Sequence, residues 1–304
     1  MKILIAGGLG YIGSALIELY RKETEHELII LDKIFKPERV ASLPQNAQYI
    51  QGDIGDIKLM KNVVKDVDLL HMMAAEVEAE NSIHKEKIVW ENNYDAPKKL
   101  MELCGNSTRI IFPSTGNVFG GVNEDEKFMG LTEKDKPKPK YPYAETKVEI
   151  EKFLISSNKN FTICRLGTNR GHTTGIRFNL VTNNFIKKAI TGEPITIHGK
   201  GENYRPTVSV KDVARGIKML STSKKAEGEI FHIIEKNYRI KNLAQKVIKF
   251  SNKEIELEHI AKDVPFNSYH LNGRKITKLG FKYEWNLERD VKEMIKVFHA
   301  LEIH

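Results

Sequence analysis

The sequence predicts an α/β protein: a doubly wound parallel sheet of Rossmann type, with a smaller α/β C-terminal domain. Three observations lead to this prediction. The chain opens with a strand, a glycine-rich turn, a helix and a second strand. Further buried strands follow around residues 67–75, 109–113 and 161–167. The 304 residues, 40% of them hydrophobic, are enough for one large or two modest cores.

The N-terminal unit accounts for the first 32 residues. Residues 2–6 form a short apolar run, residues 7–13 a turn with glycines, and residues 14–22 a helical pattern. A second apolar run over residues 28–31 ends at Asp32. This order is that of a βαβ unit.

Each glycine of the turn has a physical reason. Gly7 allows a tight turn, Gly10 lets the backbone approach a pyrophosphate, and Gly13 lets the helix pack close to the strand. The N-terminus of the helix supplies N–H donors and the positive end of the helix dipole. The turn therefore predicts a dinucleotide site, and Tyr11 and Ile12 within it are further cofactor-binding candidates.

The cofactor is indicated by Asp32. It stands about 20 residues beyond the last glycine, where a carboxylate at a strand end accepts hydrogen bonds from an adenosine ribose. The same carboxylate would repel the 2′-phosphate of NADP, so the sequence favours NAD. Against this, the adjacent Lys33 is a cation that would attract such a phosphate.

The net charge of +8 raises the question of a nucleic-acid partner. The lysines are scattered over the whole length, and the local cluster at residues 134–140 is mixed with prolines and Asp135. We expect no nucleic-acid partner and interpret the excess charge as attraction for an anionic substrate.

Composition also bears on compartment and metals. No apolar run has the length of a bilayer span, and too few apolar residues follow Lys2 for a secretion signal. Cys104 and Cys164 give no disulfide framework, and none of the 10 histidines has the spacing of a zinc-binding helix. We expect a cytoplasmic protein with no membrane partner and no metal.

The glycine motif resembles that of a known family. Residues 6–14 read Ala-Gly-Gly-Leu-Gly-Tyr-Ile-Gly-Ser, with the spacing Gly-x-x-Gly-x-x-Gly. They resemble the opening of the extended short-chain dehydrogenase/reductase family, in its NAD-dependent nucleotide-sugar epimerase and dehydratase group, which includes proteins like UDP-glucose/UDP-galactose 4-epimerase. The resemblance continues in order over nearly the whole chain.

The resemblance implies further cofactor contacts. Gly52 and Asp53 match the family's Gly-Asp pair, whose carboxylate lies against the adenine amino group, so Asp53 and the following Ile54 are candidates for contacts with the adenine. The alternative for Asp53 is a surface acid in a turn. Ala74 and Ala75 match the small residues that let the backbone approach the cofactor.

Two polar residues nearby are interpreted differently. Asn93 matches the family's asparagine at the start of a helix, here over residues 91–103, where its side chain steadies the central strands. His71 lies inside an apolar run, so we interpret it as a packed core histidine rather than a catalyst.

A candidate catalytic pair follows the strand at residues 109–113. Residues 114–120 stand at its carboxyl end, where doubly wound sheets hold their ligands. About 28 residues later, Tyr143 and Lys147 have an i, i+4 spacing that places phenol and ammonium on one face of a helix. The ammonium and a positively charged nicotinamide both lower the pKa of the phenol, which makes Tyr143 a general base.

The resemblance assigns the partners of this base. Thr115 falls on the family's catalytic Ser/Thr, which hydrogen-bonds the reacting hydroxyl, and Ser114 is its less favoured neighbour. The family's 4,6-dehydratases have Asp-Glu after this residue. The chain has Gly116 and Asn117, neither able to shuttle a proton, so dehydration is disfavoured; Asn117 is a substrate-binding candidate.

Substrate contacts in the second domain are likewise implied by the resemblance. Arg177 and Asn179 match a helix that faces the sugar nucleotide. Arg205 ends a Gly-x-Gly-x-x-x-Arg run whose arginine clamps the diphosphate, and a planar guanidinium suits that role. Asp212 is an N-cap or hinge candidate.

These observations predict an NAD-dependent nucleotide-sugar epimerase, acting at C4 through a transient 4-keto sugar. A nucleotide-sugar keto-reductase, dehydrogenase or dehydratase is the alternative within the family, and a non-catalytic NAD-sensing protein is the alternative from another class. We expect residues 1–167, with returning segments at about 205–234, to bind NAD, and residues 168–204 and 235–304 to bind the nucleotide sugar.

A homodimer is the expected assembly, through paired helices near residues 95–103 and 148–155. The apolar stripe from Leu287 to Leu301 has helical spacing and is interpreted as core or a subunit contact.

Overall fold

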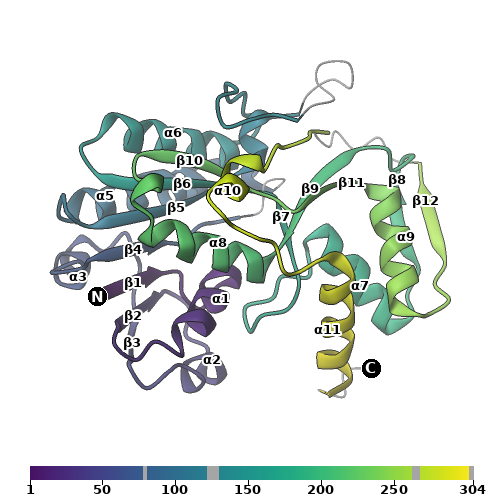
Figure 1. Ribbon diagram of the computed structural model, residues 1–304, viewed down its shortest axis with the longest axis horizontal. Helices are drawn as coiled ribbons and strands as arrows, with labels where there is room; N and C mark the ends of the chain where they lie inside the picture. The colour runs from purple at the N-terminus through teal and green to yellow at the C-terminus, as the bar shows by residue number, and fades with distance from the viewer. Residues whose placement is uncertain (78–80, 122–129, 262–267, 301–304) are drawn as a thin grey trace. The chain divides into compact units, whose positions relative to one another are not determined.

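The central element is a seven-stranded sheet in the order β10-β6-β5-β4-β1-β2-β3 (Figure 1). The computed structural model describes residues 1–77, 81–121, 130–261 and 268–300. The pairs β1–β2, β1–β4, β2–β3 and β4–β5 are parallel, which confirms the predicted Rossmann-type sheet. The strands are β1 (Lys2–Ala6), β2 (Glu27–Asp32), β3 (Ala47–Gln51), β4 (Leu69–Met72), β5 (Arg109–Thr115), β6 (Asn160–Leu166) and β10 (Glu229–Ile233).

Helices connect these strands. Their bounds are α1 (Tyr11–Tyr20), α2 (Pro37–Ala41), α3 (Ile57–Val63), α4 (Glu86–Trp90), α5 (Ala96–Leu103), α6 (Pro142–Ser156) and α8 (Val210–Thr222), with the single turns η1 (Asn81–Ile83), η2 (Glu91–Asp95), η3 (Gly116–Phe119) and η4 (Lys224–Ala226). The first strand has the predicted bounds, and its Ile3, Leu4 and Ile5 are fully buried. Both faces of a parallel sheet are covered, so its central strands are apolar throughout.

Contacts divide the chain into two compact units, each with its own hydrophobic core. Unit 1 comprises residues 1–120, 136–165 and 214–231, and unit 2 comprises residues 121–135, 166–213 and 232–304. The assignment of NAD and nucleotide sugar to the two predicted domains stays a prediction.

Unit 2 contains two small sheets and the remaining helices. Antiparallel β11 (Lys236–Arg239) and parallel β7 (Thr168–Arg170) flank β9 (Tyr204–Ser209), and β8 (Ile195–His198) pairs in parallel with β12 (Leu257–Ile260). The helices are α7 (Val181–Thr191), α9 (Ile240–Ser251), α10 (Arg274–Lys278) and α11 (Leu287–Ala300). The apolar stripe of α11 is buried in the core of this unit, whereas Leu301 lies outside the described residues.

One predicted helix start is wrong. The helix expected from residue 91 begins at Glu86 as α4, and Asn93 lies in a π-helical turn, η2, between α4 and α5. Pro97 has no N–H to donate to the carbonyl four residues earlier, and Ala96 N–H bonds to Glu91 O, five residues back. The wider turn therefore lies immediately before the proline.

A second correction concerns Arg177 and Asn179. They were expected on a helix, but α7 begins at Val181 and both precede it. The amide of Asn183 accounts for this, because its Oδ1 accepts the N–H of Gly171 at 2.9 Å and its Nδ2 donates to Arg177 O at 3.0 Å. These two bonds fold the preceding segment into a loop against the first turn of α7.

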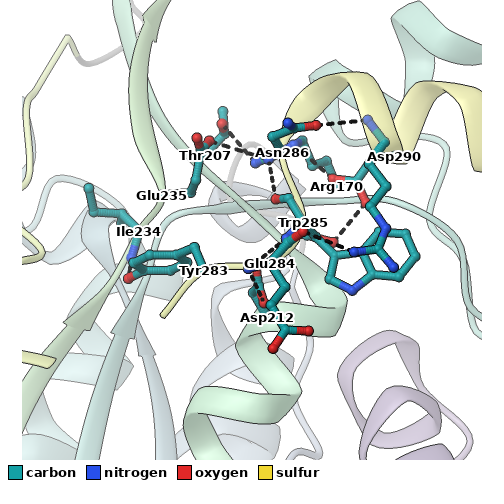
Figure 2. A network of polar contacts seen from close by, with 12 residues as sticks. Arg170, Thr207, Asp212, Ile234, Glu235, Tyr283, Glu284, Trp285, Asn286 and Asp290 are labelled. Atoms are coloured by element: carbon teal, nitrogen blue, oxygen red, sulfur yellow. Dashed lines mark hydrogen bonds and ion pairs between the residues drawn. The ribbon is translucent and has the colours of Figure 1, made fainter. Parts of the chain in front are cut away.

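Unit 2 is organised around the fully buried Arg170 of β7 (Figure 2). Its Nε lies 2.9 Å from Asp290 Oδ2, and Nη1 donates to Thr207 Oγ1 at 3.1 Å. Nη2 donates to Trp285 O at 3.1 Å and contacts Glu235 at 3.3 Å. Burial raises the pKa of the Asp290 carboxyl to about 7, and the neighbouring Arg170 opposes this shift.

Neighbouring segments close around the same group. Ser209 donates to Asp290 Oδ1 at 2.7 Å. Asp212 lies within the first turn of α8, so the N-cap alternative is wrong; its carboxylate accepts the N–H groups of Glu284 and Trp285 at 3.0 and 2.8 Å. Asp212 therefore has a structural role, joining α8 to the segment before α11.

Among the helices of the described residues, none has both the length and the apolar character needed to cross a bilayer.

The Arg170 network makes a prediction about stability. Arg170→Met leaves Asp290 buried without its partner, so the free energy of unfolding should fall by about 3–5 kcal/mol. Urea unfolding followed by Trp285 fluorescence, in a Trp90→Phe background, measures this for unit 2. Arg274→Met, an exposed arginine of α10, is the control and should cost no more than about 0.5 kcal/mol. Equal losses in the two variants would contradict the prediction.

Candidate active site

The glycine turn between β1 and α1 is constrained by its neighbours. Gly7 has φ of +81°, and a Cβ there would lie 2.5 Å from Ala74 N. A Cβ on Gly13 would lie 2.3 Å from Gly7 O. At Gly10 the single described atom within 4 Å of a Cβ is Gly7 O, at 3.2 Å, and the residue faces a cavity. Gly7 and Gly13 are thus required for packing, and Gly10 keeps space open.

The cavity, of about 330 Å³, lies in unit 1 at the carboxyl ends of β1, β2 and β4. Seven of the predicted cofactor residues line it: Gly7, Gly10, Asp32, Asp53, Ile54, Ala74 and Ala75. Tyr11 and Ile12 do not line it; they form the first turn of α1, and the Tyr11 side chain is buried. Strand order reverses between β1 and β4, which is where doubly wound sheets bind ligands.

The carboxylate of Asp32 ties the glycine turn to the end of β2. Oδ2 accepts the N–H of Leu9 and Oδ1 that of Ile34, both at 3.0 Å. Arg39 Nη1 donates to Leu9 O at 2.7 Å from the other side. Each carboxylate oxygen has a second lone pair for a ligand hydroxyl.

Three cations that the sequence analysis did not assign to the site also line the cavity: Lys33, Lys36 and Arg39. From the sequence, Lys33 was recognised only as a cation beside Asp32. A usable signal was the dense run of basic residues after the second strand. Together they offset the nearby carboxylates and suit an anionic ligand.

Asn93 acts on the segment that follows β4. Its Oδ1 accepts the N–H of Glu76 at 2.7 Å and its Nδ2 donates to Glu76 O at 2.8 Å. The side chain is almost completely buried. Asn93 therefore fixes the backbone just beyond Ala74 and Ala75, although it does not line the cavity.

Thr115 is the last residue of β5 and the N-cap of η3. Its Oγ1 accepts the N–H of Asn117 at 3.1 Å, and a hydroxyl that accepts in this way can still donate its own proton. The neighbouring Ser114 is buried, and its hydroxyl donates to Glu151 Oε1 at 2.5 Å. Thr115 and Ser114 thus have different partners at the end of one strand.

Tyr143 and Lys147 lie on one face of α6, as their spacing predicted. The Lys147 Nζ is 6.0 Å from the centre of the Tyr143 ring and 4.6 Å from that of Phe112. It also donates to Pro113 O at 3.0 Å. The structure therefore joins α6 to the carboxyl end of β5, which carries Thr115.

Lys147 is buried, with 3% of the residue exposed. Burial lowers the pKa of its ammonium to about 8, and the Glu151 carboxylate opposes the shift. Glu151 had not been assigned to the site. Its position four residues beyond Lys147 was a signal, because i, i+4 places both on one helix face.

The predicted substrate residues of unit 2 belong to two segments, the loop before α7 and strand β9. Arg177 is half-buried and Asn179 exposed, both in the loop before α7. Arg205 is half-buried on β9 and hydrogen-bonds Tyr269, which is fully buried and whose pKa is raised by that burial. The structure thus gives Arg205 a fixed guanidinium on a strand.

His71 and the candidate metal ligands have structural partners. The His71 imidazole is fully buried, bonds to the Tyr20 hydroxyl at 2.9 Å, and has its pKa lowered to about 3 by burial. Among the described residues, Glu23, Glu25 and His26 place ligand atoms within 4.8 Å of one another. His26 and Lys218 both pair with Glu23, so we assign no metal to this group.

A doubly wound sheet with a glycine turn, a strand-end aspartate and a Tyr-x-x-x-Lys helix defines a dinucleotide-binding protein of the short-chain dehydrogenase/reductase type. The model of the NAD dependent epimerase/dehydratase family matches residues 3–233. The chain belongs to this family of NAD-dependent enzymes, as the resemblance predicted.

Individual relatives agree with this assignment. A trifunctional UDP-glucose 4,6-dehydratase/UDP-4-keto-6-deoxy-D-glucose 3,5-epimerase/UDP-4-keto-L-rhamnose-reductase from Arabidopsis thaliana is 26% identical over 96% of this chain, which spans 46% of that protein's length. A UDP-glucose 4-epimerase from Lactobacillus helveticus is 29% identical over 70% of this chain and 69% of its own. The structure of a UDP-N-acetylglucosamine 4-epimerase from Methanobrevibacter ruminantium M1 has a TM-score of 0.88 at 23% identity, covering 99% of this chain and 98% of that one.

Because Gly10 and Gly13 have different neighbours, substitution of Gly10 should change NAD binding and substitution of Gly13 should change stability. Gly10→Ala should change the free energy of unfolding by less than about 1 kcal/mol yet weaken NAD binding at least about tenfold, because its methyl group enters the cavity. Gly13→Ala should destabilise unit 1 by about 1–3 kcal/mol, because its methyl group meets backbone. Calorimetric titration with NAD and urea unfolding measure the two effects. Unchanged NAD affinity in folded Gly10→Ala would remove Gly10 from the site.

Proposed function

We propose that this protein is an NAD-dependent nucleotide-sugar epimerase that acts at C4 through a transient 4-keto sugar. The observation that carries the proposal is the junction of α6 with the end of β5. There Lys147 is buried beside Tyr143, and the strand ends in Thr115 followed by Gly116 and Asn117.

The residues of unit 1 fit NAD. The glycine at position 10 leaves room at the cavity that a Cβ would fill, and Asp32 presents two carboxylate oxygens at the end of β2. We propose that Gly7 and Gly10 contact the pyrophosphate, and that Tyr11, Ile12 and Gly13 act on it through the N-terminus of α1 rather than by lining the cavity. We propose further that Asp32 binds the adenosine ribose, that Asp53 and Ile54 contact the adenine, and that Ala74 and Ala75, held through Asn93, line the remainder. NAD, when bound, supplies the hydride acceptor and donor that an oxidation followed by a reduction needs.

The catalytic roles follow from the charges. Tyr143 would take the proton of the 4-hydroxyl as general base, and Lys147 favours the phenolate because its ammonium is close and poorly screened. Thr115 would donate a hydrogen bond to the same oxygen. Lys147 also serves as the candidate ligand of the nicotinamide ribose.

The residues after Thr115 favour epimerisation over dehydration. Removal of water from the sugar needs a further acid and base, and Gly116 and Asn117 cannot exchange a proton. Asn117 is instead a candidate for a hydrogen bond to the sugar. The 4,6-dehydratase named among the relatives keeps dehydration as the second candidate.

In unit 2 we propose that Arg205 binds the diphosphate of the nucleotide sugar. A guanidinium held on a strand can bind two phosphate oxygens at once, and Arg177 and Asn179 offer further polar contacts from their loop. A sugar bound through its diphosphate keeps the freedom to present its other face before reduction.

The test is product analysis with NAD and no added reductant, against a panel of UDP-, GDP-, dTDP- and CDP-hexoses. Conversion of one sugar to its 4-epimer without net NADH is the expected result. Accumulated NADH would identify a dehydrogenase, and a released 4-keto-6-deoxy sugar a dehydratase. Binding of NAD without turnover of any sugar would favour the non-catalytic alternative.

Two variants of α6 test the base. Tyr143→Phe should lower kcat by about 10²- to 10⁴-fold while NAD still binds, because the phenol hydroxyl alone is lost. Tyr141→Phe, the same change at the N-cap residue of α6, should leave kcat within about twofold. A Tyr143→Phe enzyme with full activity would exclude Tyr143 as the base.

We propose further a cytoplasmic homodimer. Ile88 of α4 and Ile155 of α6 are 48% and 56% exposed, and α4 packs beside α6. Exposed large apolar side chains on adjacent helices favour contact with a second copy.

The state of the cysteines bears on the compartment. Both cysteines are buried and unpaired, which fits a reducing compartment.

Light scattering tests the dimer. The native protein should have twice the mass of one chain, and Ile88→Glu with Ile155→Glu should reduce it to the mass of one chain, because two charges would be buried in the interface. Ile260→Glu, the same change at an exposed isoleucine of β12, should leave the mass unchanged. A native protein with the mass of one chain would exclude the dimer.

A further inference from the structure

Glu151 is a buried carboxylate beneath the candidate catalytic pair. It lies on α6 four residues beyond Lys147 and eight beyond Tyr143, so the three side chains follow one face of the helix. Glu151 is 2% exposed. The roles proposed above for Tyr143, Lys147 and Thr115 do not use it.

Two side chains, one from β5 and one from β6, donate hydrogen bonds to the Glu151 carboxylate. Arg165 of β6 donates from Nη2 to Oε2 at 2.6 Å and from Nε to Oε1 at 3.0 Å. Ser114 of β5 donates from Oγ to Oε1 at 2.5 Å. The guanidinium of Arg165, itself 3% exposed, also lies 5.1 Å from the centre of the Phe119 ring.

Two successive residues of β5 are therefore held by α6. Lys147 Nζ donates to Pro113 O at 3.0 Å, and Glu151 accepts from Ser114. The next residue is Thr115. Because two attachments fix both the distance and the register of a strand end against a helix, they also fix where Thr115 stands relative to Tyr143.

We propose that Glu151 is a positioning residue of the active site: anchored by Arg165, it holds Ser114 against α6 and so sets the spacing between Thr115 and the Tyr143–Lys147 pair. This rests on the function proposed above. A contribution to stability alone accounts poorly for the arrangement, since a buried ion pair adds little net stability over apolar residues of similar size.

Charge gives Glu151 a second effect on the same pair. From α6 itself, the Tyr143 ring and the Glu151 carboxylate face the Lys147 ammonium. From β5, the Phe112 ring and the Pro113 carbonyl face it. Arg165 of β6 lies beyond Glu151 and is paired with it. Burial lowers the pKa of Lys147 and Glu151 opposes this, so Glu151 keeps the ammonium charged to higher pH.

Ser114→Ala tests the positioning without changing a charge. We expect kcat to fall roughly 10- to 100-fold, with the KM and the Kd for NAD changed less than about twofold, because the reacting groups and not the binding groups are displaced. The pKa of Lys147, measured by NMR of its side-chain ¹⁵N in the protein without substrate, should stay at the native value.

Glu151→Gln tests the charge. The same NMR titration should give a lower pKa for Lys147 than in the native protein, and the high-pH limb of kcat should move to lower pH. Glu151→Gln with Arg165→Met removes both charges and covers the case in which the single variant fails to fold. Glu149→Gln, at a half-buried glutamate of α6 paired with Lys152, is the matched control and should behave as the native protein.

The outcomes separate this inference from the proposed function. Native kcat in folded Ser114→Ala, together with native kcat and a native Lys147 titration in folded Glu151→Gln, would overturn the role of Glu151 and leave the epimerase proposal intact. If Glu151→Gln does not fold, native kcat in folded Glu151→Gln/Arg165→Met takes its place. If the native protein turns over no nucleotide sugar, the epimerase proposal fails. The inference then fails with it, whatever the Lys147 titration gives.

Discussion

The candidate cofactor site depends on one close approach, that of the glycine turn to the backbone after β4. A Cβ on Gly7 would lie 2.5 Å from Ala74 N, so no other residue type passes there without displacing the chain. Neighbouring parallel strands end at the same edge of a sheet, which brings the two segments together. Asp32, through Leu9, and Asn93, through Glu76, then hold the two sides, and the cavity is bounded by them.

The second requirement is a helix that carries charge into the interior. A buried lysine costs free energy unless polar groups replace the water that it loses. Around Lys147 of α6 lie the Phe112 ring and the Pro113 carbonyl of β5 and the Glu151 carboxylate of α6 itself. Even with these groups present, burial lowers the pKa of the Lys147 ammonium. Perturbed titratable groups of this kind concentrate at functional sites. The same helix therefore carries Tyr143, the proposed base, Lys147, the group proposed to tune it, and an attachment to β5.

Sequence patterns predicted the parts of the site that depend on local geometry. The first strand, the glycine turn and the Tyr143–Lys147 face each depend on spacing within a few residues, and Asp32 depends on its distance from the glycine turn within one βαβ unit. Such spacing is visible in the sequence. The place of Asn93 was wrong because a proline four residues later widens the preceding turn. The loop position of Arg177 was missed because Asn183, six residues away, bonds back to it. Arg39 and Glu151 each had a local signal, the basic run after β2 and the i, i+4 spacing from Lys147, but their hydrogen-bond partners lie 30 and 37 residues away and could not be predicted from those signals.

Asn93 also has a consequence for the lifetime of the molecule. Its amide accepts the N–H of Glu76 and donates to the carbonyl of Glu76, as a peptide group of a paired strand would, and so holds the chain beyond the end of β4. Hydrolysis of that amide to a carboxylate, a common reaction of ageing proteins, would leave the acceptor and remove the donor. A negative oxygen would then face the Glu76 carbonyl, and a single slow chemical event would loosen the wall of the cavity while the sheet stayed intact.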